Sequence, residues 1–294
     1  MSVPYAVARG LGKSFYGKTV LEDVSFDVEP GDIVGVLGKN GAGKTTLLEL
    51  MLGFTPPSAG SVELFGHASY RLPGSAKARL GFVPQQDELV NPLTAADQIG
   101  VIASFYPRWD DALVMRLARA WEVDLGERIK GMSVGQRQKL SILLALGHRP
   151  DLLILDEPVA SLDPVARRQF LEQIIDVAAD GARSVVFSSH IVSDVERLAN
   201  KIWIVKDHRL YWQGDFDALK DSIVRLHLRA PRGLPDSLPI PNALTVQRNG
   251  VAATAVVRDW TAELHHDVAD RLDRDVEVEI EPLTLEEIFL ELHR

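Results

Sequence analysis

The sequence predicts an α/β domain over residues 1–220 and a small α+β domain over residues 221–294. Strand-like and helix-like segments alternate through the first part of the chain, which is the pattern of an α/β fold. Residues 89–148 interrupt that pattern with mostly helical segments, so we expect a helical subdomain inserted there. After Lys220 the composition changes: residues 221–294 contain no lysine, 14 acidic residues and 8 arginines, for a net charge of −6.

The expected strands of the first domain are short apolar runs, and helices with one apolar face separate them. Strands are expected over residues 24–28, 33–37, 152–155 and 184–187, with a Pro30-Gly31 turn between the first two. Helices are expected from Lys44 onward and over residues 165–179. Within the inserted subdomain, helices are expected over residues 112–121 and 134–147.

The C-terminal domain is expected to combine four strands with two helices. The strands are expected over residues 224–230, 244–247, 251–257 and 276–280, and one helix over residues 261–272. Prolines between residues 231 and 241 argue against a long regular element there. Thr284 and Glu287 form a capping-box pattern that opens a final short helix. No active-site pattern occurs in this domain, so we expect a role in dimer contact or regulation.

The composition is that of a globular protein, with 46% hydrophobic and 25% charged residues. A net charge of −9 argues against sequence-independent binding to nucleic acid or anionic lipid. The absence of cysteine excludes disulfides, thiolate catalysis and cysteine metal sites. No stretch approaches the roughly 18 consecutive apolar residues needed to cross a bilayer, and the N-terminal segment lacks the pattern of a signal peptide. We therefore expect any membrane role to come through a partner chain.

A phosphate-binding loop is the first motif that carries chemistry. The pattern G-x-x-x-x-G-K-[ST] is matched by Gly38, Lys39, Asn40, Gly41, Ala42, Gly43, Lys44 and Thr45. An expected strand precedes the loop and an expected helix follows, so backbone N–H groups and a helix N-terminus can face phosphate oxygens. We expect Lys44 to neutralise the β- and γ-phosphates and Thr45 to ligate Mg²⁺, with Thr46 also in the nucleotide site.

A second motif follows the apolar run at residues 152–155, which ends in Asp156 and Glu157. A buried strand there delivers Asp156 to its tip, where the carboxylate faces the metal through water. Glu157 then lies beside the γ-phosphate, placed to polarise an attacking water. An apolar run ending in Asp-Glu is common by itself, but together with the phosphate-binding loop it predicts a nucleotide hydrolase.

Four further segments occur in a fixed order along the chain. They are Phe82-Val83-Pro84-Gln85, Met132-Ser133-Val134-Gly135-Gln136-Arg137-Gln138, Ser161-Leu162-Asp163 and Ser188-Ser189-His190. These segments resemble the Q-loop, the LSGGQ signature, the D-loop and the switch-histidine loop of the ABC ATPases, a resemblance that covers roughly residues 5 to 220. The resemblance implies a P-loop NTPase core of the ABC ATPase type, which binds ATP and Mg²⁺.

Three positions depart from the family pattern. Met132 stands where the signature has leucine, Val134 where it has its first glycine, and Lys39 where the loop commonly has proline. Gly135, whose backbone approaches phosphate, is retained. Val134 can occupy a normal helix-start conformation, so we expect an active site.

The resemblance also implies roles for single residues. Glu157 is implied as the catalytic carboxylate, and His190 as a contact of the γ-phosphate. Gln85 is implied to sense Mg²⁺ and the attacking water, so that Thr45, Gln85 and Asp156 are the metal-site residues.

Adenine is implied to stack on an aromatic side chain just before the second strand. Phe15 and Tyr16 are the two candidates. Gapless spacing to Lys13 and Leu21 favours Phe15, whereas the Tyr16-Gly17 pair favours Tyr16.

The signature segment points to a dimer. Ser133 and Gln136 form a capping-box pattern, and a helix N-terminus headed by serine is an anion site. In the family this site serves the γ-phosphate held by the opposite protomer, so Ser133, Gly135 and Gln136 are implied to close on ATP at the partner's Lys44. Asp163 is implied to communicate between the two sites. The expected assembly is a homodimer, or a heterodimer with a paralogous ATPase, that closes with ATP and opens after hydrolysis.

Three kinds of ABC protein fit these motifs. The ending at residues 282–292 resembles ATPase subunits of ABC-2-type exporters, which favours an exporter subunit with a separate transmembrane permease and no nucleic-acid partner. An importer subunit with a regulatory C-terminal domain is the first alternative. A soluble translation or DNA-repair ATPase is the second. The exporter interpretation implies a cytoplasmic protein, peripheral on the cytoplasmic face of the membrane.

An aromatic cluster at residues 105–109 admits two interpretations. Packing between helices is favoured, and a groove that receives the membrane subunit is the alternative.

Overall fold

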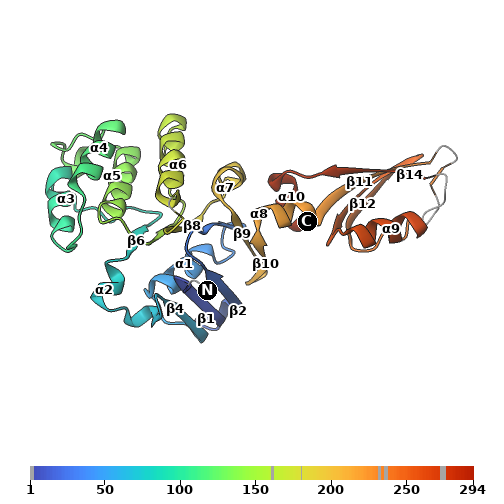
Figure 1. Cartoon of the computed structure of the whole chain (residues 1–294), viewed down its shortest axis with the longest axis horizontal. Coiled ribbons are helices and arrows are strands. Elements are labelled where there is room, and N and C mark those ends of the chain that lie inside the picture. The colour runs from blue at the N-terminus through green and yellow to red at the C-terminus, as the bar shows by residue number, and fades with distance from the viewer. Residues whose placement is uncertain (1–2, 160–161, 180, 231–232, 235–237, 272–275) are drawn as a thin grey trace. The chain divides into compact units, whose positions relative to one another are not determined.

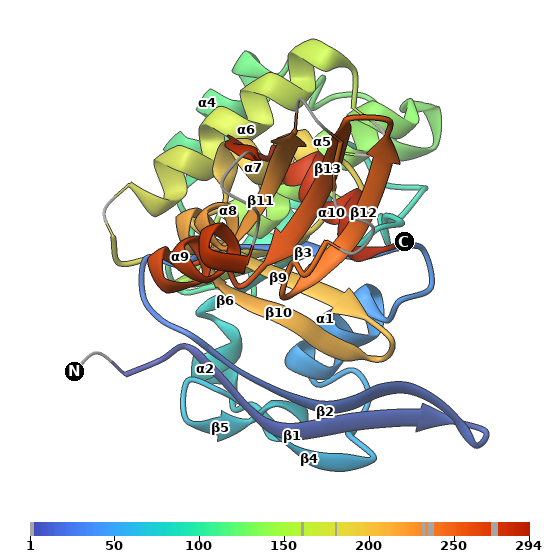
Figure 2. The same ribbon diagram turned by 90° about the vertical axis from the view of Figure 1, so that its right-hand side faces the viewer.

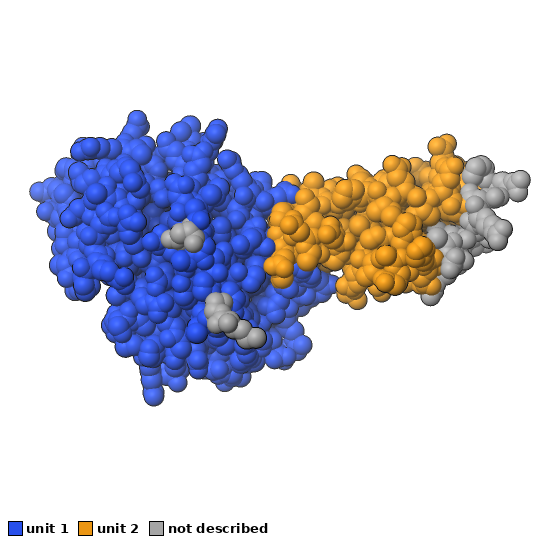
Figure 3. All heavy atoms as spheres, viewed as in Figure 1, with its two compact units in different colours: residues 1–213 blue, residues 214–294 orange. Residues whose placement is uncertain are grey.

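The computed structural model describes residues 3–159, 162–179, 181–230, 233–234, 238–271 and 276–294 (Figure 1). Ser161 of the D-loop-like segment and Leu272 at the end of an expected helix lie outside these residues. The chain divides into two compact units, residues 1–213 and 214–294, coloured blue and orange in Figure 3. The expected assignment of residues 1–220 to an ATPase domain stays a prediction.

A six-stranded sheet forms the centre of the first unit. Its strand order is β10-β9-β3-β8-β7-β6, and the pairs from β9 through β6 are parallel. The strands are β3 (Ile33–Leu37), β6 (Leu80–Val83), β7 (Leu152–Leu155), β8 (Ser184–Ser188), β9 (Lys201–Lys206) and β10 (Arg209–Asp215). Every residue of β7 and β8 is buried, as continuous apolar strands of a parallel sheet require. The α/β fold class and the strands expected from these apolar runs are confirmed.

A second, antiparallel sheet shares its core with the first. Its order is β2-β1-β4-β5. Its strands are β1 (Ala6–Phe15), β2 (Lys18–Val28), β4 (Ala59–Leu64) and β5 (His67–Ala68). Helix α1 (Lys44–Leu52) contributes Leu47, Leu48 and Met51 to a buried cluster that also contains strand residues of both sheets. This cluster fixes the start of α1 against the end of β3.

The inserted segment consists of helices that gather at one end of the first unit (Figure 1). They are α3 (Ala95–Ala103), α4 (Asp111–Ala120) and α5 (Val134–Leu146). Thr94, Asp110 and Ser133 cap them, each accepting a backbone N–H from the first helical turn. The two helices expected here are confirmed. The other helices of this unit are α2 (Gly74–Lys77), α6 (Pro164–Ala178) and α7 (Val192–Leu198), with 3-10 turns η1 (Ser69–Arg71) and η2 (Ile129–Gly131).

In the aromatic cluster at residues 105–109, two side chains are packed and one is exposed. Trp109 packs against Gly147, and Tyr106 stacks on His148 with ring centroids 4.0 Å apart. Phe105 is 72% exposed. Packing between helices, the favoured interpretation, therefore holds for two of these aromatic residues and fails for Phe105.

The second unit has an antiparallel sheet (Figure 2), and buried residues of this unit form a core of their own. The strand order is β12-β13-β11-β14. Its elements are α8 (Phe216–Ser222), β11 (Ile223–Arg229), β12 (Ala243–Asn249), β13 (Ala252–Arg258), α9 (Ala262–Arg271), β14 (Glu277–Pro282) and α10 (Leu285–Leu292). Leu226 and Leu228 of β11 lie on the same buried face as Ala253 and Ala255 of β13. The capping box at Thr284 is confirmed. Across the described parts of both units, no helix is long and apolar enough to cross a membrane.

Close packing of β6 on α5 gives the first prediction. A Cβ at Gly81 would lie 2.8 Å from the carbonyl oxygen of Ala145 and 2.9 Å from Pro150, so Gly81→Ala must displace backbone. We predict a loss of about 1–3 kcal/mol in the free energy of unfolding. Gly100→Ala, in the middle of α3 with open space around it, should stabilise by about 0.5–1 kcal/mol. Urea unfolding measures both, and equal midpoints for the two variants would contradict the close approach.

Candidate functional site

The predicted phosphate-binding loop curls between β3 and α1. Gly43 has φ +107°, a left-handed conformation that favours glycine, and it immediately precedes the first residue of α1. Gly38 is required for space, since a Cβ there would lie 2.7 Å from the carbonyl oxygen of Val205. The loop therefore has the backbone that the motif predicted, between the expected strand and helix.

Lys44 lies inside this loop and is only 7% exposed. Its Nζ donates a hydrogen bond of 2.9 Å to the carbonyl oxygen of Gly38 and a longer one of 3.5 Å to that of Lys39. The same Nζ is 3.8 Å from Oε1 of Glu157. The ammonium group is thus held at the loop centre, beside the carboxylate that ends the next motif.

The ends of β7 and β8 bring the two acidic residues into position. Leu155 pairs with Phe187 in parallel register, so Asp156 and Ser188 follow side by side. The Ser188 hydroxyl donates a hydrogen bond of 2.5 Å to Asp156 Oδ1 and accepts one of 2.9 Å from the backbone N–H of Glu157. No local pattern in the sequence predicts a role of its own for Ser188. Its position at the end of a strand beside β7 is the signal that could have indicated one.

The buried Glu157 carboxylate lies between Lys44 and His190. Its Oε2 lies 2.7 Å from Nδ1 of His190 and accepts a 3.2 Å hydrogen bond from the backbone N–H of the same residue. Its Oε1 faces Lys44. Glu157 is 8% exposed, whereas the His190 side chain is 53% exposed. The carboxylate is therefore fixed from both sides, and the imidazole keeps an open edge.

A pocket of about 330 Å³ collects part of the predicted site. Its lining residues are Val20, Asn40, Gly41, Gly43, Lys44, Thr45, Thr46, Gln85 and Glu157. The loop, the Q-loop-like glutamine and the second acidic residue are thus brought together. Val20 of β2 was not expected, because nothing in its local pattern distinguishes it from a sheet residue. The lining does not include Phe15, Tyr16, Ser133, Gly135, Gln136 or Asp163.

The two adenine candidates occupy different backbone conformations at one hairpin. Phe15 ends β1, pairs with Lys18 across the hairpin, and has the Lys13 Nζ 4.7 Å from its ring centroid. Tyr16 lies in the turn with φ +49° and a fully exposed side chain. The structure therefore holds the Phe15 ring and leaves the Tyr16 ring in solvent.

The signature-like segment forms the start of α5. Ser133 Oγ accepts the backbone N–H of Gln136 at 3.3 Å, and Gln136 Oε1 accepts the backbone N–H of Ser133 at 2.8 Å. Val134 is the first helical residue and is 65% exposed, so it fits the helix start as expected. Gly135 is the second residue of α5, and its lack of a side chain leaves the backbone there uncovered by a side chain of its own.

Asp163 caps a helix in this structure. Its Oδ1 accepts the backbone N–H groups of Val165 and Ala166, at the start of α6. These hydrogen bonds, that of Ala166 first, lower the pKa of Asp163 below its ordinary value. Capping is what the structure assigns to Asp163, and communication between two sites stays a prediction.

Arg137 ties α5 to the segment that follows Gln85. Its guanidinium donates to both carboxylate oxygens of Asp87, to Asn91 Oδ1 at 2.7 Å and to the Ile129 carbonyl at 3.0 Å. Hydrogen bonding to Arg137 lowers the pKa of Asp87 below its ordinary value of 3.8. One side chain thus joins the signature helix to the segment just after the predicted Q-loop.

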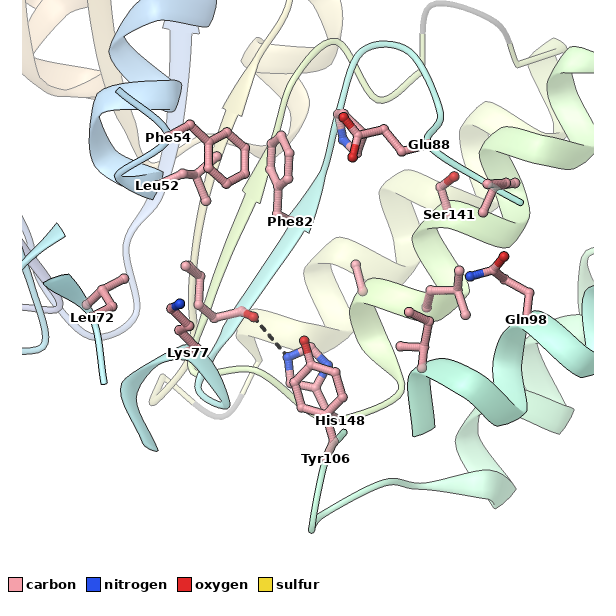
Figure 4. Close-up of a pocket in the computed structure, with 16 residues that line it drawn as sticks. Leu52, Phe54, Leu72, Lys77, Phe82, Glu88, Gln98, Tyr106, Ser141 and His148 are labelled. Carbon is pink, nitrogen blue, oxygen red and sulfur yellow. Dashed lines mark hydrogen bonds between the residues drawn. The ribbon is translucent and has the colours of Figure 1, made fainter. Parts of the chain in front are cut away.

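A larger pocket of about 450 Å³ lies between β6 and the inserted helices (Figure 4). Phe54, Leu72 and Phe82 line one part, and His148 and Tyr106 line another. His148 Nε2 lies 3.0 Å from the carbonyl oxygen of Leu80, and burial lowers the pKa of its imidazole. Since its lining is mostly apolar, this groove suits a protein segment better than a phosphate.

The oxygen groups near the loop fit Mg²⁺ held together with a nucleotide. Thr45 and Gln85 line the pocket of about 330 Å³, and Asp156, which is 3% exposed, directly precedes the lining residue Glu157. Hydroxyl, amide and carboxylate oxygens are hard ligands, and Mg²⁺ in nucleotide sites takes the rest of its shell from phosphates and water. Among the described residues no group of three or more His, Cys, Asp and Glu side chains could hold a metal. The described residues therefore do not form a metal site from clustered His, Cys, Asp or Glu side chains alone.

Known proteins share this architecture. A family model described as ABC transporter matches residues 21–160. The ABC transporter ATP-binding protein YtrB of Bacillus subtilis (strain 168) is 28% identical over 96% of each chain. Nod factor export ATP-binding protein I of Paraburkholderia xenovorans (strain LB400) is 31% identical over 95% of this chain and 94% of that protein. A solved structure of an ATP-binding subunit of an ABC transporter is 28% identical, with a TM-score of 0.68, over 74% of this chain and 92% of that one.

The ion pair between Asp87 and Arg137 predicts a pH-dependent contribution to stability. Since the folded-state pKa of Asp87 is lowered, the contribution is present above the unfolded pKa and is lost as pH falls through the folded pKa. We predict that Arg137→Met lowers the free energy of unfolding by about 1–2 kcal/mol near neutral pH, and that this difference shrinks below about pH 4.

Urea unfolding of the wild-type chain and of Arg137→Met, near neutral pH and again below about pH 4, measures this difference in the free energy of unfolding. Arg168→Met is the matched control, because Arg168 pairs with Glu172 on an exposed helix face and should contribute less than about 0.5 kcal/mol. A deficit in Arg137→Met that is the same at both pH values would contradict the assigned cause.

Proposed function

Because this chain belongs to the family of ABC transporter ATP-binding proteins, we propose that it hydrolyses Mg-ATP to drive export through a separate transmembrane permease. The observation that carries the proposal is the meeting of Lys44, Thr45 and Glu157 in one pocket. A phosphate-binding loop and a fixed carboxylate are the two groups that hydrolysis of a triphosphate requires.

The chain's own groups divide the chemistry between them. Loop N–H groups and the Lys44 ammonium bind the triphosphate. Glu157 accepts a proton from water as the water oxygen bonds to the terminal phosphorus and the bond to the ADP oxygen breaks. His190 holds Glu157 through Nδ1 and is proposed to contact the terminal phosphate through the other edge of its ring. Mg²⁺, when bound, offsets phosphate charge.

We propose that a second copy completes the site. The phosphate pocket of one chain does not include Ser133. Ser133 is exposed at the N-terminus of α5, where the positive end of the helix dipole and the backbone N–H groups of the first turn favour an anion. A terminal phosphate on one copy would accept hydrogen bonds from this helix start on the other. Dimer closure would then require ATP, and release of phosphate would open the dimer.

We propose that the membrane partner binds at the larger pocket, the groove between β6 and the inserted helices (Figure 4). Phe54, which lines it, is 65% exposed, and Phe105, the neighbour in sequence of the lining residue Tyr106, is 72% exposed. Arg137 joins the signature helix to Asp87, and the next residue, Glu88, lines the groove. A segment seated there could therefore act on the ATP site. Export is favoured because a relative 31% identical over 95% of this chain is named as an export protein. We further propose that the chain works at the cytoplasmic face of the membrane, bound to its permease.

Replacement of two site residues should separate binding from turnover. We predict that Glu157→Gln lowers ATP turnover at least about 100-fold, because the proton acceptor is lost. ATP should still bind and should hold two copies together. Lys44→Ala should weaken ATP binding about 10-fold or more, because a buried charge-assisted contact is removed.

Light scattering with Mg-ATP reports the dimer, and equilibrium titration reports ATP affinity. A Glu157→Gln variant that binds ATP yet stays monomeric at saturating Mg-ATP would contradict completion of the site by a second copy.

The hairpin predicts which aromatic residue meets adenine. Phe15 sits in a strand with its ring held by Lys13, so little freedom is lost on stacking. We predict that Phe15→Ala weakens ATP affinity about 5-fold or more, while Tyr16→Ala changes it less than about 2-fold. Titration with ATP and with inorganic triphosphate distinguishes adenine stacking from general damage, since triphosphate affinity should be equal in both variants. A larger effect of Tyr16→Ala would reverse the assignment.

A further inference from the structure

One buried hydroxyl lies between the two acidic residues at the end of β7. Ser188 has no exposed surface, and its side chain contacts both residues of the pair. Its Oγ donates to Asp156 Oδ1 at 2.5 Å and accepts the backbone N–H of Glu157 at 2.9 Å. A hydroxyl has one donor and can accept as well, so both interactions form at once.

The interaction with Asp156 sets the direction of its carboxylate. A hydroxyl that donates to an ionised carboxylate makes a short, charge-assisted hydrogen bond. Because that bond uses Oδ1, the rotation of the carboxylate is fixed and Oδ2 has a defined direction. Asp156 is 3% exposed, so water has little access to replace the serine.

The interaction with Glu157 holds an unusual backbone conformation. Glu157 has φ +48°, a left-handed conformation that residues other than glycine adopt rarely. Such a conformation persists where its surroundings determine it. The Ser188 hydroxyl supplies one such restraint on the Glu157 amide. The resulting turn directs the Glu157 carboxylate to Lys44 on one side and His190 on the other.

We propose that Ser188 is a positioning residue that orients Asp156 toward the metal side of the site and Glu157 toward the attacking water. This inference rests on the proposed hydrolysis of Mg-ATP. Because Ser188 has no exposed surface, it acts through these two residues and not by contact with substrate. Without its hydroxyl, the buried Asp156 Oδ1 and Glu157 N–H lose a shared partner. The Asp156 carboxylate then loses its fixed direction, and the turn that directs Glu157 loses one restraint.

The test compares Ser188→Ala with Ser184→Ala. Ser184 is also fully buried, but it lies at the other end of β8, where its hydroxyl donates to the carbonyl oxygen of Glu29 at 2.7 Å. Ser188→Ala is expected to lower ATP turnover about 10- to 100-fold, the scale expected for misplaced catalytic groups. Ser184→Ala is expected to stay within about 3-fold of wild type, and Ser188→Thr, which keeps a hydroxyl, should recover most of the loss.

A binding measurement gives a readout besides activity. Titration with a fluorescent ATP analogue is carried out at several Mg²⁺ concentrations. For Ser188→Ala, affinity without Mg²⁺ is expected to match wild type, and the Mg²⁺ concentration that gives half of the Mg²⁺-dependent gain is expected to rise several-fold. A purely structural defect would lower affinity with and without Mg²⁺ alike, which would overturn the proposal.

Ser188→Ala turnover within about 2-fold of wild type would also overturn it. Should that variant fail to fold, Ser188→Cys replaces it, since a thiol has similar size but donates poorly. Wild-type turnover in Ser188→Cys would then overturn the proposal. All comparisons are made with wild-type chain that binds and hydrolyses ATP. A wild-type chain that does neither would overturn the proposed function itself and is thereby distinguished from failure of the Ser188 inference.

Discussion

The parallel pairing of β8 with both of its neighbours is the constraint on which the candidate site depends. Val36 of β3 pairs with Ser188, and Leu155 of β7 pairs with Phe187, so the three strands end at one edge of the sheet. The phosphate-binding loop leaves β3 there, and the two acidic residues leave β7. Segments more than a hundred residues apart in sequence thus reach one pocket because the hydrogen-bond register of buried strands allows few alternatives.

Electrostatics at that edge follow from burial. Lys44 and Glu157 are each less than 10% exposed and lie 3.8 Å apart, so each limits the cost of burying the other's charge. His190 and the loop carbonyls satisfy the remaining polar atoms. Under the proposed function, an incoming triphosphate would meet an ammonium group and a carboxylate that are already in place. The start of α5, a helix N-terminus that favours an anion, does not line this pocket, which is why we infer that a second copy supplies it.

Much of this site could be predicted from the sequence, because its motifs are contiguous. The loop at residues 38–45, the strand before Asp156 and the capping box at Ser133 each show a local pattern, and each occurs as expected. Ser188 and Val20 could not be found in that way, since their roles depend on register and on which strands are neighbours. For a similar reason, the sequence did not show that the cluster at residues 105–109 is packed at Tyr106 and Trp109 but exposed at Phe105. The Trp109 ring packs against Gly147, which lies 38 residues further along the chain. A contact between such distant residues leaves no periodic pattern in the sequence.

In the proposed cycle, one chain binds each triphosphate and a second chain covers it. A structure of this chain crystallised with a non-hydrolysable ATP analogue and Mg²⁺ tests this arrangement. We predict a two-fold dimer in which each terminal phosphate contacts Lys44 of one copy and Ser133 of the partner subunit. A fully occupied nucleotide site enclosed by residues of a single chain, with the serine at the start of α5 facing solvent in every copy, would contradict it.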